Sequence, residues 1–295
     1  MVTEPVRIRG IDSRVAERGP TALRIAVGGQ LRKLREAKGV TPVEAGEHIR
    51  GSHAKISRLE LGRTGYKDRD ILDLLTLYGV TEPDQREMFV DLARRANQPG
   101  WWHQYNDLLP PWFETYLGLE GAAQTIRTFE GQLVPGLLQT EDYTHAVIEV
   151  GHQNAEASRR VELRTKRQEI LDLTNGPRLW AVLDEAVLHR PIGGKRVLRE
   201  QLEHLVEVSK KPRVTIQVLP YDTGGHAAAG SSFTMLRFAE MELPDIVYLE
   251  QLTSALYLDR KEDLQLYREV MDKVAVQACQ PEQSRELLIA AAKEL

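Results

Sequence analysis

The chain has 295 residues, enough for about two domains, and its 42% hydrophobic and 28% charged residues are typical of a globular protein. No apolar run approaches the roughly 20 residues that span a bilayer, and no apolar stretch follows the N-terminal arginines as it would in a secretory signal. The single cysteine, Cys279, excludes an internal disulfide framework and a cysteine-based zinc cluster. These features predict a cytoplasmic protein without membrane contact, metal or other cofactor.

Charge is divided unevenly along the chain. The formal net charge is −4, but residues 1–69 carry a net +7 and residues 70–295 a net −11. A basic head on an acidic body is typical of a nucleic-acid-binding module joined to another domain.

Residues 1–22 mix charged residues with Pro and Gly without periodicity, and we predict a flexible arm there. The helical pattern that follows ends at the break Gln98-Pro99-Gly100. We therefore predict a first domain over 23–98 and a second over 99–295.

The first domain has the sequence pattern of a helix-turn-helix. In the first helix, Leu31 and Leu34 recur at helical spacing and leave Arg32, Lys33 and Arg35 for solvent or DNA phosphate.

A second helix begins with Thr41 as a capping residue and Pro42 at the first helical position, and a tight Arg50-Gly51 turn follows. Gly46 is small where the second and third helices must cross, and Ile56 is expected to fill that gap. Gly62 supplies a stop for the third helix.

The third helix is expected to enter the DNA major groove. Ser52 caps its start, and Ile56 and Leu59 form its apolar side. The residues expected at base edges are His53, Ala54, Lys55 and Arg58. Those expected on phosphates are Thr41, Ser52, Arg32, Lys33 and Arg63. The alternative is three amphipathic helices that pack together without nucleic acid.

The second domain is predicted to be α+β, with a mostly antiparallel sheet flanked by helices. Helical patterns cover about 115–130, 139–151, 155–174, 194–210, 260–278 and 281–294. Short β-rich runs cover Leu179–Leu183, Val214–Leu219, Phe233–Phe238, Ile246–Leu249 and Leu256–Leu258.

Three features of the second domain are candidates for partner or ligand contact. The glycine-rich segment Tyr221–Gly230 contains His226, although a flexible loop explains it as well. Trp101 and Trp102 could stack on a ligand or pack between domains. A helix with alternating charges carries Arg159, Arg160, Arg164 and Arg167, which form either a solvated face or a docking surface.

No catalytic residue is predicted. Asp184 and Glu185 with His189 follow a predicted strand, but neither a nucleophile elbow nor a metal motif accompanies them. Capping, salt bridges or partner contacts explain these side chains.

From about Arg24 to Leu295 the chain resembles large actinobacterial regulators that join a phage-repressor (Xre-type) helix-turn-helix to an antitoxin-like C-terminal domain of unassigned function. The stretches that carry the resemblance are Gly100-Trp101-Trp102, Thr115–Glu120, Val134–Tyr143, Val182–Ala186, Arg190-Pro191, Gly193-Gly194, Val218–Pro220, Ser232–Thr234 and Val247-Tyr248.

The resemblance implies a transcriptional regulator, often paired with a small acidic partner protein, and no enzymatic activity. Three positions depart from the family pattern. Pro42 replaces a usual Gln, Arg50 stands where Gly is usual, and His53-Ala54 replaces a usual Gln-Ser. The operator sequence is therefore not carried over.

Two hypotheses follow. In the first, the chain is a sequence-specific DNA-binding regulator that binds a double-stranded operator as a homodimer, and its C-terminal domain senses a partner protein or ligand. In the alternative, the C-terminal domain is an antitoxin-like protein-binding scaffold and the head only regulates its own expression.

Overall fold

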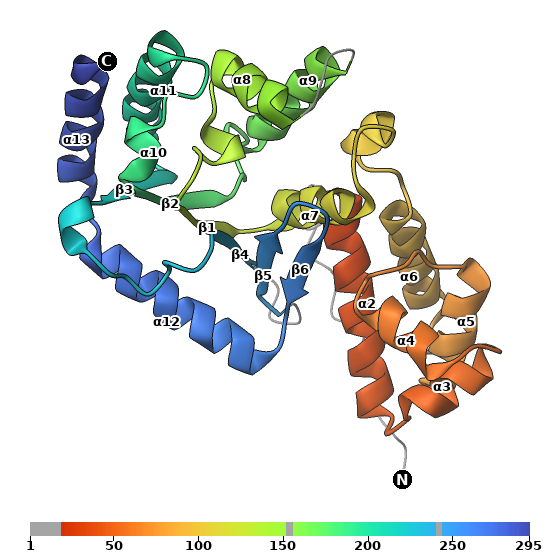
Figure 1. The fold of residues 1–295 in the computed structure, drawn as a ribbon. Helices are drawn as coiled ribbons and strands as arrows, with labels where there is room; N and C mark the ends of the chain where they lie inside the picture. The colour runs from red at the N-terminus through yellow and green to blue at the C-terminus, as the bar shows by residue number, and fades with distance from the viewer. Residues whose placement is uncertain (1–18, 152–155, 240–243) are drawn as a thin grey trace. The chain divides into compact units, whose positions relative to one another are not determined.

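The computed structural model describes residues 19–151, 156–239 and 244–295 (Figure 1). The described chain divides into two compact units. Unit 1 comprises 19–103 with Ala239, and unit 2 comprises Gln104–Phe238 with Pro244–Leu295. Most of the predicted arm lies outside the described residues, but its last residues differ from the prediction because the first helix already begins at Pro20.

Unit 1 is a helical bundle, as predicted. Its helices are α2 (Pro20–Ala37), α3 (Pro42–His48), α4 (His53–Glu60), α5 (Asp68–Leu77) and α6 (Pro83–Ala96), followed by the 3₁₀ turn η1 (Trp101–Tyr105) that leads into unit 2. Apolar residues at helical spacing fill its centre because each short helix can bury only one face. The side chains with the least exposure include Val27, Leu31, Ile71, Leu75, Tyr78 and Phe89.

The helices α2 and α4 cross at very short range. A Cβ atom on Gly28 would lie 2.5 Å from the carbonyl oxygen of Leu59 and 2.6 Å from that of Glu60. Only glycine leaves room for the two backbones at this point. The crossing joins α4 to α2, the longest helix of the unit, and this contact holds α4 against the core.

Unit 2 contains a mixed six-stranded sheet with the order β3-β2-β1-β4-β5-β6. Its strands are β1 (Thr125–Glu130), β2 (Arg178–Asp184), β3 (Val214–Leu219), β4 (Phe233–Arg237), β5 (Ile246–Glu250) and β6 (Ala255–Leu258). Strands β1, β2 and β3 are parallel, whereas β4, β5 and β6 continue the sheet with antiparallel pairs.

The expectation of a mostly antiparallel sheet was therefore wrong for one half of the sheet. A helical connection lies between β1 and β2 and another between β2 and β3, and such connections carry the chain back to start a parallel strand. The predicted helix over 115–130 is also wrong at its end, where β1 forms the centre of the sheet. The five β-rich runs all form strands.

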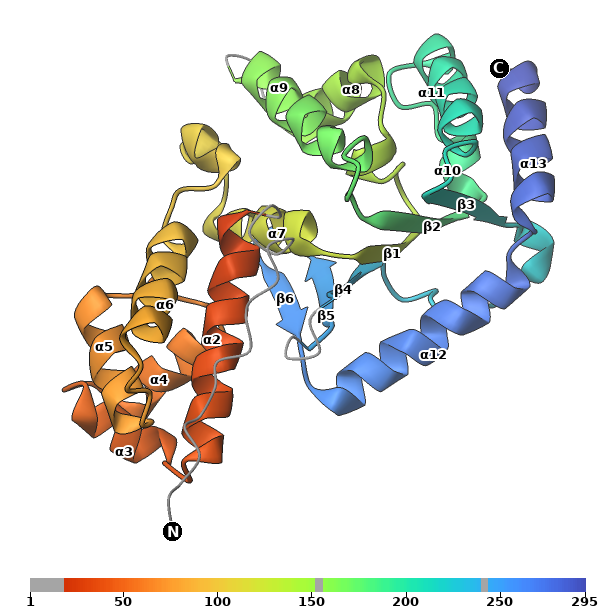
Figure 2. The same cartoon turned by 180° about the vertical axis from the view of Figure 1, so that it is seen from behind.

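Helices lie on both faces of the sheet (Figure 1, Figure 2). The helices of unit 2 are α7 (Pro111–Ala122), α8 (Glu141–Gly151), α9 (Ala157–Gln168), α10 (Ala186–His189), α11 (Lys195–Val208), α12 (Lys261–Gln277) and α13 (Pro281–Glu294). Its short 3₁₀ turns are η2 (Gly136–Leu138), η3 (Glu169–Leu171) and η4 (Tyr221–Thr223). In both views α12 crosses one face, whereas α8, α9 and α11 lie on the other.

The face under α12 is apolar. Phe129, Val182 and Val247 from three strands pack against Met271 and Val274 of α12, and all five are at most 2% exposed. This burial fixes the register of the strands because a shift by one residue would turn the apolar side chains to the other face. Over the described residues, no helix combines the length and the apolar character that a bilayer crossing requires.

Candidate nucleic-acid interface

The segment α3–turn–α4 has the predicted helix-turn-helix form. The Thr41 side chain accepts a hydrogen bond from the Glu44 N–H at 3.2 Å, and Glu44 Oε2 accepts one from the Thr41 N–H at 2.7 Å. Pro42 occupies the first turn of α3, and Ser52 Oγ accepts the Lys55 N–H at 3.3 Å at the start of α4. The predicted caps are confirmed, and they set where both helices begin.

The turn brings the two helices into backbone contact. A Cβ on Gly46 would lie 2.7 Å from the carbonyl carbon of Ser52, so the small residue is required here. The contact is with the turn backbone rather than with Ile56, which was expected to fill the gap. Arg50 has φ 54°, whereas glycines supply the other positive φ values among the described residues. The left-handed conformation, which favours glycine, is thus carried by an arginine at this turn.

Helix α4 exposes a polar face and buries an apolar one. Ile56 and Leu59 are 1% and 2% exposed, as predicted. His53 and Arg58 are exposed, and Ala54 is half-buried. The Arg58 guanidinium has no partner among the described residues, so its five N–H donors are available to a ligand.

Lys55 is placed differently from Arg58. Its ammonium lies 2.6 Å from Oδ2 of Asp70, a residue of α5 that is 7% exposed. The Lys55 side chain is half-buried. This ion pair joins α4 to α5, and Lys55 must leave it before its ammonium can reach a base.

The residues assigned to phosphates are all on the surface of unit 1. Arg32 and Lys33 are exposed on α2, and Arg63 is exposed just after α4. The Arg32 Nε donates to Glu36 at 2.8 Å, an exposed pair that costs little to break.

At the start of α3, the exposed Thr41 gives its hydroxyl and its N–H to Glu44, so its polar groups are occupied in the unbound protein. These two hydrogen bonds lower the pKa of Glu44, which keeps a negative charge beside Thr41.

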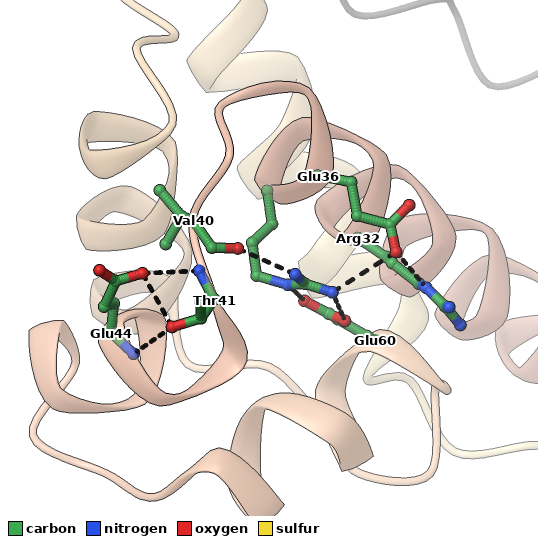
Figure 3. Close-up of polar contacts among 7 residues, drawn as sticks. Arg32, Glu36, Val40, Thr41, Glu44 and Glu60 are labelled. Atoms are coloured by element: carbon green, nitrogen blue, oxygen red, sulfur yellow. Dashed lines mark hydrogen bonds and ion pairs between the residues drawn. The ribbon is translucent and has the colours of Figure 1, made fainter.

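Arg35, which was expected to face solvent or phosphate, is instead a core residue. Its partners Glu60 and Val40 are labelled in Figure 3. Arg35 is 7% exposed, and its guanidinium donates to both oxygens of Glu60 at 2.6 and 3.0 Å and to the carbonyl of Val40 at 2.9 Å. The hydrogen bonds with Glu60 raise the pKa of Arg35. Since Glu60 is the last residue of α4, this pair fixes that end of the helix to α2.

A second support of α4 was not predicted from the sequence. The single proton of the buried Tyr66 hydroxyl is shared between the carbonyl oxygens of Arg24, at 2.5 Å, and Leu59, at 3.0 Å. The Asn97 side-chain amide accepts a hydrogen bond from the Tyr66 N–H at 2.9 Å and donates one to the Tyr66 carbonyl oxygen at 2.6 Å. Burial raises the pKa of Tyr66, so the hydroxyl keeps its proton. Only the contacts of the folded chain reveal this role, because a tyrosine and an asparagine 31 residues apart carry no local signal.

The four arginines of α9 do not share one exposed surface, because Arg167 is buried. A partner role for the other three stays a prediction. Arg167 is buried and donates to both carboxylate oxygens of Glu120, at 2.5 and 2.6 Å. Arg159 donates a hydrogen bond to Asp107. Arg160 donates to Glu156 and to the Leu108 carbonyl oxygen. Arg164 donates to the Gln139 side chain at 2.6 Å. Intramolecular partners therefore occupy these charges.

The remaining candidates are His226, Trp101 and Trp102. His226 is in the loop after β3 with 12% of its side chain exposed, and its Nε2 is 3.6 Å from Oδ2 of Asp184. Trp101 and Trp102 in η1 are half-buried and pack edge to face with ring centroids 5.8 Å apart. A ligand role for any of the three stays a prediction.

Comparisons with known families match two regions of the chain. Residues 26–88 match a helix-turn-helix domain, which indicates a DNA-binding regulator. Residues 113–290, more than half of the chain, match the family described as "Domain of unknown function (DUF5753)". Comparisons with curated proteins and with solved structures gave no match. The chain thus belongs to the DUF5753 family, and a helix-turn-helix domain precedes its family domain.

Proposed function

We propose that the protein is a sequence-specific transcriptional regulator of the Xre type, similar to the actinobacterial regulators described above, whose helix α4 reads the major groove of an operator. The observation that carries this proposal is the form of α4. Its apolar side is fixed in the core by Ile56 and Leu59. Its opposite side presents His53 and Arg58, and the Arg58 guanidinium has no partner within the part of the chain that the structure describes.

Within that face, the side chains differ in their roles. Arg58 is the base reader, because a free guanidinium can bond both acceptors of a guanine edge. His53 and Ala54 contact neighbouring bases at the start of the helix. Lys55 contributes only in a complex that replaces Asp70 with a nucleic-acid partner, since the ion pair at 2.6 Å otherwise holds it.

Electrostatics support this orientation. Residues 1–69 carry a net +7, and Arg32, Lys33 and Arg63 place positive charge on the surface of unit 1. Such residues bind phosphates and release counterions, which gives affinity without sequence preference. In the proposed complex, the hydroxyl groups of Ser52 and Thr41 contact DNA phosphates. The Thr41 hydroxyl must then give up its hydrogen bond to Glu44.

The C-terminal domain is proposed to dimerise the protein and to take input from a partner protein or a ligand, in the cytoplasm, without catalysing a reaction. The size of the C-terminal domain supports a sensory role in addition to dimerisation. The described residues of unit 2 form a six-stranded mixed sheet with helices on both faces, far more than a dimerisation element needs.

The test of base reading is selection from a random DNA pool with the full chain. We expect Arg58→Ala to weaken binding to the wild-type operator by about 1–3 kcal/mol and to lose preference at one base pair of each half-site. The matched control is Lys33→Ala, which should weaken all sequences alike and lower the slope of affinity against salt concentration. Recovery of the wild-type operator by a folded Arg58→Ala variant would contradict the proposal.

A further inference from the structure

A groove of about 740 Å³ lies in unit 2, well away from α4 in the sequence. One side is the glycine-rich loop after β3, with Gly225, His226, Ala227 and Ala229. The other side is the C-terminal half of α12, with Asp272, Lys273, Val276 and Gln277. DNA binding by the head uses none of these residues.

The groove adjoins the carboxyl edge of the parallel strands. His226 lies beside Asp184, the last residue of β2, and its ring centroid is 5.3 Å from that of Phe129 near the end of β1. The loop itself follows the end of β3. In open α/β sheets, ligands bind beyond the carboxyl ends of parallel strands because the connecting loops converge there.

His226 has an unsatisfied hydrogen-bonding atom. Its Nδ1 is buried and lacks a hydrogen-bond partner among the described residues, whereas Nε2 faces the Asp184 carboxylate at 3.6 Å. A buried polar atom without a partner costs stability. A ligand that supplies the missing hydrogen bond would remove this cost, and Gly224 and Gly225, with open space at both Cβ positions, leave the loop room to adjust.

Charge selects the type of ligand. Asp272 is neutralised by Arg127, whose Nη2 lies 2.7 Å from its Oδ1. Lys273 is exposed and makes no ion pair with any described residue, so its positive charge is uncompensated at the groove. Val276, one helical turn after Lys273 in α12, is 83% exposed although it is apolar.

We propose that this groove binds a small organic anion. Its carboxylate or phosphate pairs with Lys273, its apolar body covers Val276 and the loop alanines, and a polar group bonds His226. This inference deepens the sensory role proposed for the C-terminal domain and rests on it for its regulatory meaning, but the binding itself does not involve DNA.

The experiment is isothermal titration of the full chain, without DNA, with phenylacetate, its neutral amide phenylacetamide, and inorganic phosphate. A ligand of this size is expected to bind with Kd of about 1 mM. Phenylacetate should bind more tightly than the amide, which lacks the charge, and than phosphate, which lacks the apolar body. No phenylacetate binding up to about 10 mM, or equal binding of acid and amide, would overturn the proposal.

Substitutions then locate the site. Lys273→Gln should weaken phenylacetate binding about two- to fivefold, as expected for the loss of one exposed ion pair. The matched control is Lys261→Gln, at the exposed start of the same helix but outside the groove, which should bind as the wild type does. Val276→Ser should weaken phenylacetate more than phosphate. Equal affinity in Lys273→Gln and wild type would contradict the assignment even if phenylacetate binds elsewhere.

Operator binding by the same preparation separates this proposal from the proposed function. If the wild type selects an operator but does not bind phenylacetate, the groove proposal fails and the regulator stands. If phenylacetate binds as described and no operator is selected, the groove proposal stands and DNA reading fails.

Discussion

Arg50 occupies a backbone conformation that favours glycine. At φ 54° the Cβ of an L-residue crowds its own carbonyl, which costs about 1–2 kcal/mol. We predict that Arg50→Gly raises the free energy of unfolding of unit 1 by about 0.5–1 kcal/mol, because relief of this strain exceeds the entropy cost of glycine. Urea unfolding of the full chain measures the change.

The control for Arg50→Gly is Glu47→Gly, one turn earlier in α3, where the backbone is helical. Glycine there should lower stability by about 1 kcal/mol. Equal destabilisation by the two substitutions would show that the Arg50 backbone is not strained.

Glu130, at the end of β1, gives unit 2 a pH-dependent stability. Burial raises its pKa from the ordinary 4.5 to about 7, and a hydrogen bond with Ser232 opposes the rise. Between these two values the folded state holds a proton that the unfolded state has released, so stability falls as pH rises from about 4.5 through 7.

We predict that Glu130→Gln removes this loss, so that wild type and variant diverge as pH rises. Thermal unfolding between pH 5 and about 8 measures it. The exposed Glu203→Gln on α11 should keep the wild-type slope. Parallel stability curves for wild type and Glu130→Gln would contradict the burial of this carboxyl group.

At the scale of elements, the angle between α3 and α4 depends on Gly46. A methyl group there would meet the Ser52 carbonyl carbon at 2.7 Å and its oxygen at 2.9 Å, and backbone atoms cannot rotate away. We predict that Gly46→Ala lowers the free energy of unfolding of unit 1 by about 1–3 kcal/mol and weakens operator binding, because α4 must move. Chemical unfolding and DNA titration measure the two effects.

Gly121, in α7, is the matched control for Gly46→Ala. A Cβ at Gly121 meets nothing within 4 Å, so Gly121→Ala should be neutral or stabilising by about 0.5–1 kcal/mol. If Gly46→Ala behaves in the same way, the close approach of α3 and the turn is not rigid.

Helix α9 has a structural role that its charge pattern conceals. Arg159, Arg160 and Arg164 bond the segments around Asp107, Leu108 and Gln139. Arg167 forms a buried ion pair with Glu120 of α7. Removing one partner of such a pair costs about 3–5 kcal/mol because the other charge stays buried. Charge reversal on α9 would therefore unfold unit 2 rather than test a docking surface.

At the scale of the whole molecule, we predict a two-fold dimer on palindromic DNA. A single helix-turn-helix covers one half-site and buries too little surface for tight specific binding. Two heads related by a two-fold axis would contact half-sites about one helical turn apart. Light scattering on the full chain with and without operator measures the mass. A monomer in both conditions at micromolar concentration would refute the prediction.

The sequence alone determined the features that depend on neighbouring residues. The caps at Thr41 and Ser52, the turn after Ile49 and the apolar side of α4 are local, since each involves residues within one or two helical turns. The same holds for the five β-rich runs, whose composition marks them as strands. The uneven charge of the chain also follows directly from its residues.

Only the tertiary structure decided which polar residues are free. Arg35 and Arg58 look alike in the sequence, yet Arg35 is buried against Glu60, 25 residues away, and Arg58 faces solvent. The parallel half of the sheet, the Lys55–Asp70 pair and the meeting of His226 with Asp184 likewise depend on contacts between distant segments. Local periodicity does not encode such pairings, because they arise when the chain buries its apolar faces and brings remote polar groups together.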